Sequence, residues 1–177
     1  PHMISALKWS ISVVMLYHRP MTNQTALPHD HEHCIDSALT LARELCTERA
    51  VKLTPIREKV LEIVWRSHKP VGAYDVLDTL ARSHKAARPP TVYRALDFLM
   101  AEGLIHKIES LNAYLGCGEA GHAHESQFLI CRTCGTAEEI VDGALDAALD
   151  AATKRSGFAV ERKVVEIAGK CRRCQMA

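Results

Sequence analysis

Little net charge, no internal repeat and no long apolar run characterise this sequence of 177 residues. Its 22 Lys and Arg residues nearly balance its 21 Asp and Glu residues, so the formal net charge is only +1. A nucleic-acid partner would therefore have to be held by local charge rather than by a protein that is basic throughout. The apolar stretch over residues 4–17 is too short to span a bilayer, and no Ala-x-Ala-like cleavage site follows it. These absences exclude a membrane-spanning protein and disfavour a secreted one, so we expect a cytoplasmic protein that has no membrane partner.

The charges are nevertheless distributed unevenly along the chain. Residues 50–107 contain ten Lys or Arg against six Asp or Glu, whereas residues 108–177 contain eight against ten. Apolar residues make up 47% of the chain, which is enough for real hydrophobic cores. A basic first half followed by a slightly acidic second half indicates a DNA-facing module followed by a module of another kind.

Seven cysteines are an odd number, and without a convincing signal peptide they favour a reducing compartment, where paired cysteines are more often metal ligands than disulfides. Four of them form two C-x-x-C pairs, each at the end of a strand-like apolar run. These are Cys131 with Cys134, and Cys171 with Cys174. This spacing lets both thiolates of a pair reach one ion at about 2.3 Å, and two pairs complete a tetrahedral zinc site. Two disulfides or a redox-active pair are the alternatives.

Apolar periodicity predicts four helices, over residues 35–49, 54–68, 73–83 and 91–102, followed by strands over 104–109 and 112–115. This order is that of a winged helix-turn-helix. Beyond it we expect a strand over 126–131, an Ala-rich helix over 142–156 and a strand over 158–167. The predicted fold class is therefore α+β, with an N-terminal winged helix-turn-helix domain (35–115), a glycine-containing hinge (116–124) and a small C-terminal α/β domain with the four-cysteine zinc site (125–177).

Residues 1–34 form an N-terminal extension in this division. Residues 1–3 have the look of an expression-tag remnant, and residues 4–17 are the apolar stretch. A histidine-rich run, His29–Cys34, is either a weak metal binder or a polar tail, and we assign it no function.

The first turn of the helix predicted to start at Thr91 has the composition of a DNA-reading surface. If its apolar face is turned to the core, Thr91, Tyr93 and Arg94 cluster on the exposed side. Arginine can fork onto a guanine, and tyrosine and threonine can contact phosphate or a thymine methyl group. An ordinary solvated helix is the alternative interpretation.

Further residues of the types that bind metals lie in the hinge and in the segments on either side of it. They are His106, Cys117, His122, His124, Glu125, Glu138 and Glu139. A metal site that senses should bridge parts that move relative to one another, because its binding energy then favours one arrangement. A set of imidazole, thiolate and carboxylate ligands suits tetrahedral zinc, and the soft sulfur of Cys117 favours zinc over iron or manganese.

Four features occur together in this sequence: Pro-Pro-Thr-Val-Tyr-Arg-Ala-Leu (89–96), the downstream Gly-Leu-Ile-His-Lys-Ile-Glu (103–109), the His- and Cys-containing hinge and the two C-x-x-C pairs. In this combination the sequence resembles the Fur superfamily of metal-sensing repressors. The resemblance covers about residues 35–174 and is strongest to the zinc-responsive branch. It implies a homodimer that binds an AT-rich palindromic operator in double-stranded DNA when loaded with metal, with residues 125–177 as the dimerisation domain. It also implies DNA contacts by Tyr74, and Arg57 is a further candidate for the phosphate backbone.

The resemblance further implies which hinge residues form the regulatory zinc site. The matching positions are His106, Cys117, His124 and Glu139, with His122 as the alternative ligand. Iron-sensing relatives lack a cysteine at the position of Cys117. We therefore expect a zinc-responsive repressor of zinc uptake genes that is not an enzyme and binds about two Zn²⁺ per chain. A Fur-type sensor of iron, another metal or peroxide is the nearer alternative, and a thiol-disulfide oxidoreductase is the distant one.

Overall fold

The computed structural model describes residues 31–67, 69–85, 87–121 and 126–176. The apolar stretch over residues 4–17 and the start of the histidine-rich run lie outside these ranges. Within them the chain combines helices with short strands, which confirms the predicted α+β class. Across the described ranges we find no helix that is both long enough and apolar enough to cross a membrane.

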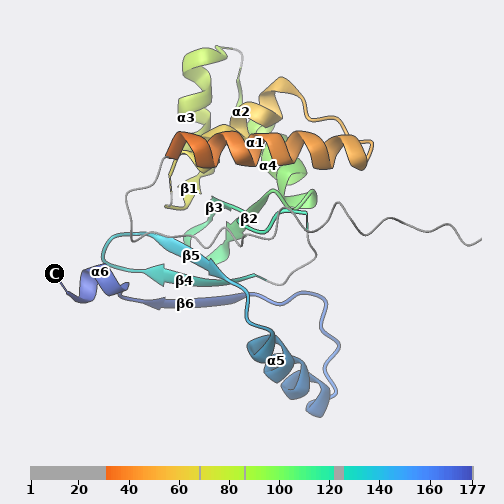
Figure 1. Ribbon diagram of the computed structural model, residues 1–177, viewed down its shortest axis with the longest axis vertical. Coiled ribbons are helices and arrows are strands. Elements are labelled where there is room, and N and C mark those ends of the chain that lie inside the picture. The colour runs from red at the N-terminus through yellow and green to blue at the C-terminus, as the bar shows by residue number, and fades with distance from the viewer. Residues whose placement is uncertain (1–30, 68, 86, 122–125, 177) are drawn as a thin grey trace, which may run out of the picture.

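Four helices from the first half of the chain lie together on one side of the molecule (Figure 1). They are α1 (His31–Glu48), α2 (Pro55–Trp65), α3 (Ala73–Ser83) and α4 (Pro89–Ala101). The start of α2 agrees with the sequence pattern. Thr54 has an extended backbone and accepts a hydrogen bond from the amide of Arg57, and Pro55 occupies the first helical position, where its missing amide is not needed.

Three short antiparallel strands lie beneath these helices, in the order β1-β3-β2. They are β1 (Val71–Gly72), β2 (Ile105–Ile108) and β3 (Ala113–Gly116). A short 3₁₀ turn, η2 (Glu109–Leu111), joins β2 to β3, and Asn112 closes it with a left-handed backbone (φ 46°) that asparagine tolerates well. Helices followed by a hairpin that pairs with β1 form the winged helix-turn-helix that the order of segments predicts.

The second sheet has the order β5-β4-β6, with β5 antiparallel and β6 parallel to the central strand. Its strands are β4 (Gln127–Cys131), β5 (Ala137–Ile140) and β6 (Val165–Gly169). A parallel pair needs a long crossover, and α5 (Gly143–Arg155) lies within it. The carboxylate of Asp142 caps α5 by accepting hydrogen bonds from the amides of the next turn, and the short helix α6 (Arg172–Gln175) follows β6.

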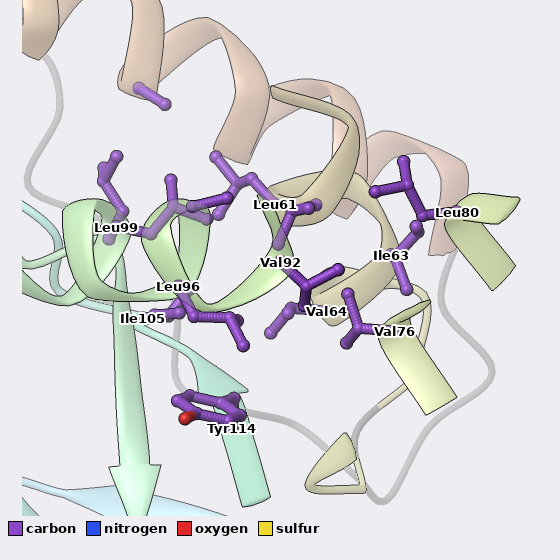
Figure 2. Packing of buried hydrophobic residues seen from close by; sticks show 14 of the residues in the cluster. Leu61, Ile63, Val64, Val76, Leu80, Val92, Leu96, Leu99, Ile105 and Tyr114 are labelled. Atoms are coloured by element: carbon purple, nitrogen blue, oxygen red, sulfur yellow. The ribbon is translucent and has the colours of Figure 1, made fainter. Parts of the chain in front are cut away.

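Two hydrophobic clusters hold these parts together. In the larger one, side chains of α2 and α4 point toward each other, and Ile105 and Tyr114 close the cluster from the hairpin side (Figure 2). The smaller cluster joins the two sheets. It consists of Ile108, Leu115, Phe128, Ile130 and Ala137. The β2–β3 hairpin therefore contributes to both cores.

The structure corrects several boundaries. The strand predicted over 158–167 is wrong in its first half, because strand pairing begins only at Val165, and Phe158 is 68% exposed. Helices α1 and α4 begin earlier than predicted, α4 because proline is well tolerated in a first helical turn. The sequence patterns did not predict β1, β5 or α6, which are too short to show a clear periodicity.

Gly116 provides a test of the packing between the helices and the hairpin. A Cβ atom at Gly116 would lie 2.4 Å from Cε2 of Trp65, so either the indole or the end of β3 would have to move. We expect Gly116→Ala to lower the free energy of unfolding by about 1–3 kcal/mol, measured by urea denaturation. Gly143→Ala is the control, because a Cβ there meets nothing within 4 Å and should not lower it. Equal stabilities for Gly116→Ala and the wild type would contradict the close packing.

Candidate metal centres and nucleic-acid interface

The parallel pairing of β4 with β6 brings the two C-x-x-C pairs to the same edge of the second sheet. Cys131 ends β4 opposite Gly169 of β6, and Cys171 follows two residues later. The Sγ atoms of Cys131, Cys134, Cys171 and Cys174 all lie within 4.8 Å of one another. The Sγ atoms of Cys134 and Cys171 are 3.8 Å apart, close to the separation of about 3.8 Å that two sulfurs have in a tetrahedral zinc–thiolate site. The donor set and its spacing therefore fit a structural zinc ion.

Hydrogen bonds and a nearby cation favour the thiolate form of Cys134, whereas a hydrogen bond with Cys171 and burial raise the pKa of Cys174 to about 12. Hydrogen bonds from the hydroxyl and backbone amide of Thr136 lower the pKa of the Cys134 thiol to about 5. The guanidinium of Arg173 also interacts with this sulfur, and the contact raises the pKa of Arg173. All seven cysteines belong to the described part of the chain, and no disulfide joins any two of them there. The alternative of two disulfides is therefore not the arrangement of this structure.

A second group of metal-ligand side chains lies between the two sheets. His106 belongs to β2, Cys117 directly follows β3, and Glu139 belongs to β5. One ligand atom from each lies within 4.8 Å of the other two. Nε2 of His106 is 3.0 Å from a carboxylate oxygen of Glu139, and the ring of His106 packs against that of Phe128 at a centroid distance of 5.4 Å.

In the second group Cys117 is buried while His106 and Glu139 are partly buried, and burial affects the members differently. The thiol of Cys117 is 2% exposed, and its pKa is raised chiefly by burial and secondarily by the charge of Glu139. Burial would also raise the pKa of Glu139. The hydrogen bond and charge of His106 outweigh it, however, and with hydrogen bonds from Ser126 and Gly118 they lower this pKa to about 2. A fixed carboxylate beside a partly exposed imidazole and a buried thiol is a donor set suited to a zinc ion.

Two of the sequence-predicted ligands are not described. His124 and its alternative His122, together with Glu125, lie outside the described residues. Ser126 was not among the predicted site residues, but its hydroxyl donates to Glu139 at 2.6 Å and lies 3.2 Å from Nε2 of His106. A lone serine before a strand gives no signal of this role, because the role depends on how β4 pairs with β5.

The predicted DNA-contacting side chains of α4 are accessible. Tyr93 is 40% exposed, Arg94 is exposed and Thr91 is half-buried. Because α4 begins with two prolines, which have no amide hydrogen, and the amide of Thr91 is bonded to the carbonyl of Arg88, this helix end has few free amides for a phosphate. Recognition by α4 would therefore depend on its side chains.

The two other predicted DNA contacts differ in their surroundings. Tyr74, in the first turn of α3, is 69% exposed. Arg57 is engaged within the protein, because its guanidinium lies 3.6 Å from the ring centroid of Phe98 and donates a hydrogen bond to the carbonyl of Lys52. The cation–π contact ties α2 to α4.

Comparisons with known proteins agree with this geometry. The profile of the Ferric uptake regulator family matches residues 48–168. The zinc uptake regulation protein of Escherichia coli K12 is 38% identical over 137 residues, which cover 77% of this chain and 80% of that protein.

Two solved structures have the same fold over 80% of this chain. One is a zinc uptake regulator complexed with zinc and DNA, with 36% identity, a TM-score of 0.76 and 95% of its chain covered. The other is the crystal structure of holo XcZur, with 42% identity, a TM-score of 0.74 and 99% of its chain covered. Since the family profile spans more than half of the chain, this protein belongs to the ferric uptake regulator family, whose members are transcription regulators rather than enzymes.

Proposed function

We propose that this protein is a zinc-responsive transcriptional repressor that binds operator DNA as a homodimer when loaded with zinc and controls zinc uptake genes. The observation that carries the proposal is the cluster of His106, Cys117 and Glu139, which joins the β2–β3 hairpin to the second sheet. The identity to zinc uptake regulation proteins supports zinc as the metal. So does the thiol of Cys117, because soft sulfur suits zinc better than it suits Fe(II) or Mn(II).

We assign two zinc ions to each chain. The four cysteines at the edge of the second sheet would hold the structural one. His106, Cys117 and Glu139 would hold the regulatory one, with His124 as the fourth ligand and His122 as its alternative. In this division residues 35–115 read DNA, 116–124 form the hinge and 125–177 form the dimerisation domain.

The regulatory site would act by fixing the hairpin. A zinc ion held there would supply the attraction that keeps β2 and the start of the hinge against β5. The hairpin packs on the helices through Ile105 and Tyr114, so its orientation sets that of α4. Two α4 helices of a homodimer can enter successive major grooves only at one separation, about one helical turn or a multiple of it.

A second copy of the chain would cover the exposed face of the C-terminal half. None of the residues of α5, all of which are described, is buried, and α5 extends away from the rest of the protein (Figure 1). Large apolar side chains in the segment leading into β6 and in β6 itself are also exposed; they are Phe158, Val160, Val164 and Ile167. An isolated helix of 13 residues is only marginally stable in water. Packing against the corresponding apolar surface of a second copy would therefore stabilise α5.

The operator we propose is an AT-rich palindrome in double-stranded DNA, which the protein binds in the cytoplasm. Thr91, Tyr93 and Arg94 of α4 would face the major groove, and Tyr74 of α3 would contact the DNA beside it. Arg57 would contribute mainly by fixing α2 against α4, because its guanidinium already lies on Phe98.

Opening the structural site should remove both zinc and stability. We expect Cys131→Ser to bind at least one zinc fewer per chain and to lose several kcal/mol of folding free energy, because structural zinc binding is coupled to folding. Elemental analysis and thermal unfolding measure both effects. Cys34→Ser, in a half-buried position outside the cluster, should retain the zinc content. A Cys131→Ser protein with unchanged zinc content would contradict the structural assignment.

The regulatory site is tested by a mobility shift on an AT-rich palindrome with zinc titrated against a chelator. We expect Glu139→Gln and Cys117→Ser to keep the structural zinc but to lose most of the zinc-dependent gain in DNA affinity, about tenfold or more. Glu138→Gln is the matched control, because neighbouring residues of β5 point to opposite faces. The proposal fails if the wild type binds equally with and without zinc, or if Cys117→Ser keeps the full response.

The DNA-reading role of Arg94 has its own test. We expect Arg94→Gln to weaken operator binding by roughly 5- to 150-fold and to reduce discrimination between operator and random DNA, as loss of a bidentate base contact does. Fluorescence anisotropy with both DNAs measures this. Arg43→Gln removes the same charge from an exposed position of α1, a helix to which we assign no DNA contact, and should have little effect. Equal effects of the two changes would mean that Arg94 contributes only general charge.

A further inference from the structure

Glu166 of β6 makes a contact that the metal clusters do not explain. Its carboxylate accepts hydrogen bonds from two backbone amides of the turn between β2 and β3, from Glu109 at 2.6 Å and from Ser110 at 3.1 Å. Donor and acceptor are more than 50 residues apart in the sequence, and they belong to different sheets. Hydrogen bonds to an ionised acceptor are about twice as strong as those between neutral groups.

Ion pairs surround this contact. The carboxylate of Glu109 pairs with Lys107 at 2.8 Å and also with Arg162, which lies in the segment before β6. The pKa of Glu109 is correspondingly lowered by its hydrogen bonds to Lys107 and Arg162. Two side chains therefore hold the tip of the hairpin. Glu166 of β6 binds the backbone amides of the tip, and Arg162, which precedes β6, binds the side chain of Glu109.

A local cap would satisfy the same amides without joining the sheets. The first amides of a helical turn need an acceptor, and a nearby Ser, Thr, Asp or Asn side chain is the usual one. In η2 the residue at the cap position is Ile108, whose side chain makes no hydrogen bond. The amides of this turn therefore take their acceptor from the second sheet. The same hydrogen bonds order the turn and attach it to that sheet.

The hairpin is consequently attached to the second sheet at both ends. At its base, His106 and Cys117 meet Glu139, and at its tip Glu109 and Ser110 meet Glu166. The two attachments are about 10 Å apart, given about 3.3 Å per residue along β2. Between them, Ile108 and Leu115 pack in the smaller cluster, but apolar packing is not directional and leaves the hairpin some freedom to pivot about its base. A second attachment at the tip removes that freedom.

We propose that Glu166 is a positioning residue that holds the tip of the β2–β3 hairpin against the second sheet, and that zinc at the base controls DNA binding only while this contact is made. The proposal rests on the proposed zinc-responsive function. Glu166 touches neither metal ligand nor DNA in it, and acts through the orientation of the hairpin and hence of α4.

The test compares full-length Glu166→Gln with Glu44→Gln. The first change keeps the size of the side chain but replaces one carboxylate oxygen by an amide group that cannot accept a hydrogen bond. The second removes the same charge from an exposed position of α1. Three quantities are measured for each protein: amide hydrogen exchange at Glu109 and Ser110, zinc content, and affinity for an AT-rich palindrome with and without saturating zinc.

We expect Glu166→Gln to exchange faster at both amides, to keep about two zinc ions per chain and to lose about 5- to 50-fold of the zinc-dependent gain in DNA affinity. Glu44→Gln should match the wild type in all three measurements. Unchanged amide exchange, or an unchanged zinc response despite faster exchange, overturns the role of Glu166. Loss of zinc from Glu166→Gln also overturns it, because the residue would then support the metal site itself. A wild-type protein whose DNA affinity ignores zinc overturns the proposed function, and the coupling with it.

Discussion

The register of the parallel pair β4–β6 is the constraint on which the rest of the structure depends. It places Cys131 opposite Gly169, which brings the second C-x-x-C pair to the first, and it places Phe128 opposite Glu166, which brings that carboxylate to the hairpin tip. Successive side chains in a strand point to opposite faces, so a slip of one residue would turn Glu166 away and separate the cysteines. One set of backbone hydrogen bonds therefore determines both the position of the four-cysteine cluster and the contact of Glu166 with the hairpin.

The β2–β3 hairpin transmits that constraint to the helices, because its two faces belong to different cores. Ile105 and Tyr114 pack with α2 and α4, whereas Ile108 and Leu115 pack with the second sheet. The hairpin cannot change its position on one side without disturbing its packing on the other, since protein interiors are closely packed. Through this shared element, a metal bound by His106, Cys117 and Glu139 between the two sheets would influence the orientation of α4, although α4 supplies none of these ligands.

The sequence predicted well what depends on local pattern. The apolar spacing predicted the helices and their buried side chains, such as Val92, Leu96 and Leu99, and the C-x-x-C spacing predicted the four-cysteine cluster. The features it did not predict depend on pairing between distant segments. Whether residues 158–164 form a strand is decided by a neighbouring strand rather than by alternation. The only local sign of the Glu166 contact is a charge inside an apolar run, and such a charge is equally typical of a strand that faces water on one side.

The two ligand clusters differ in what they join, and this difference suits them to different tasks. All four cysteines lie on or beside β4 and β6, strands that already pair through their backbones, so a metal there adds stability to one arrangement. His106, Cys117 and Glu139 come from both sheets, which contact each other through a core of only five side chains. Burial of each large apolar side chain in this interface contributes about 1.5–3 kcal/mol to its stability. Polar contacts and metal ligands beside this core therefore make up a substantial fraction of the free energy that holds the two sheets together. In the function we propose, a metal bound across this interface would therefore bias how the two sheets are arranged, whereas a metal bound within one sheet would mainly stabilise that sheet.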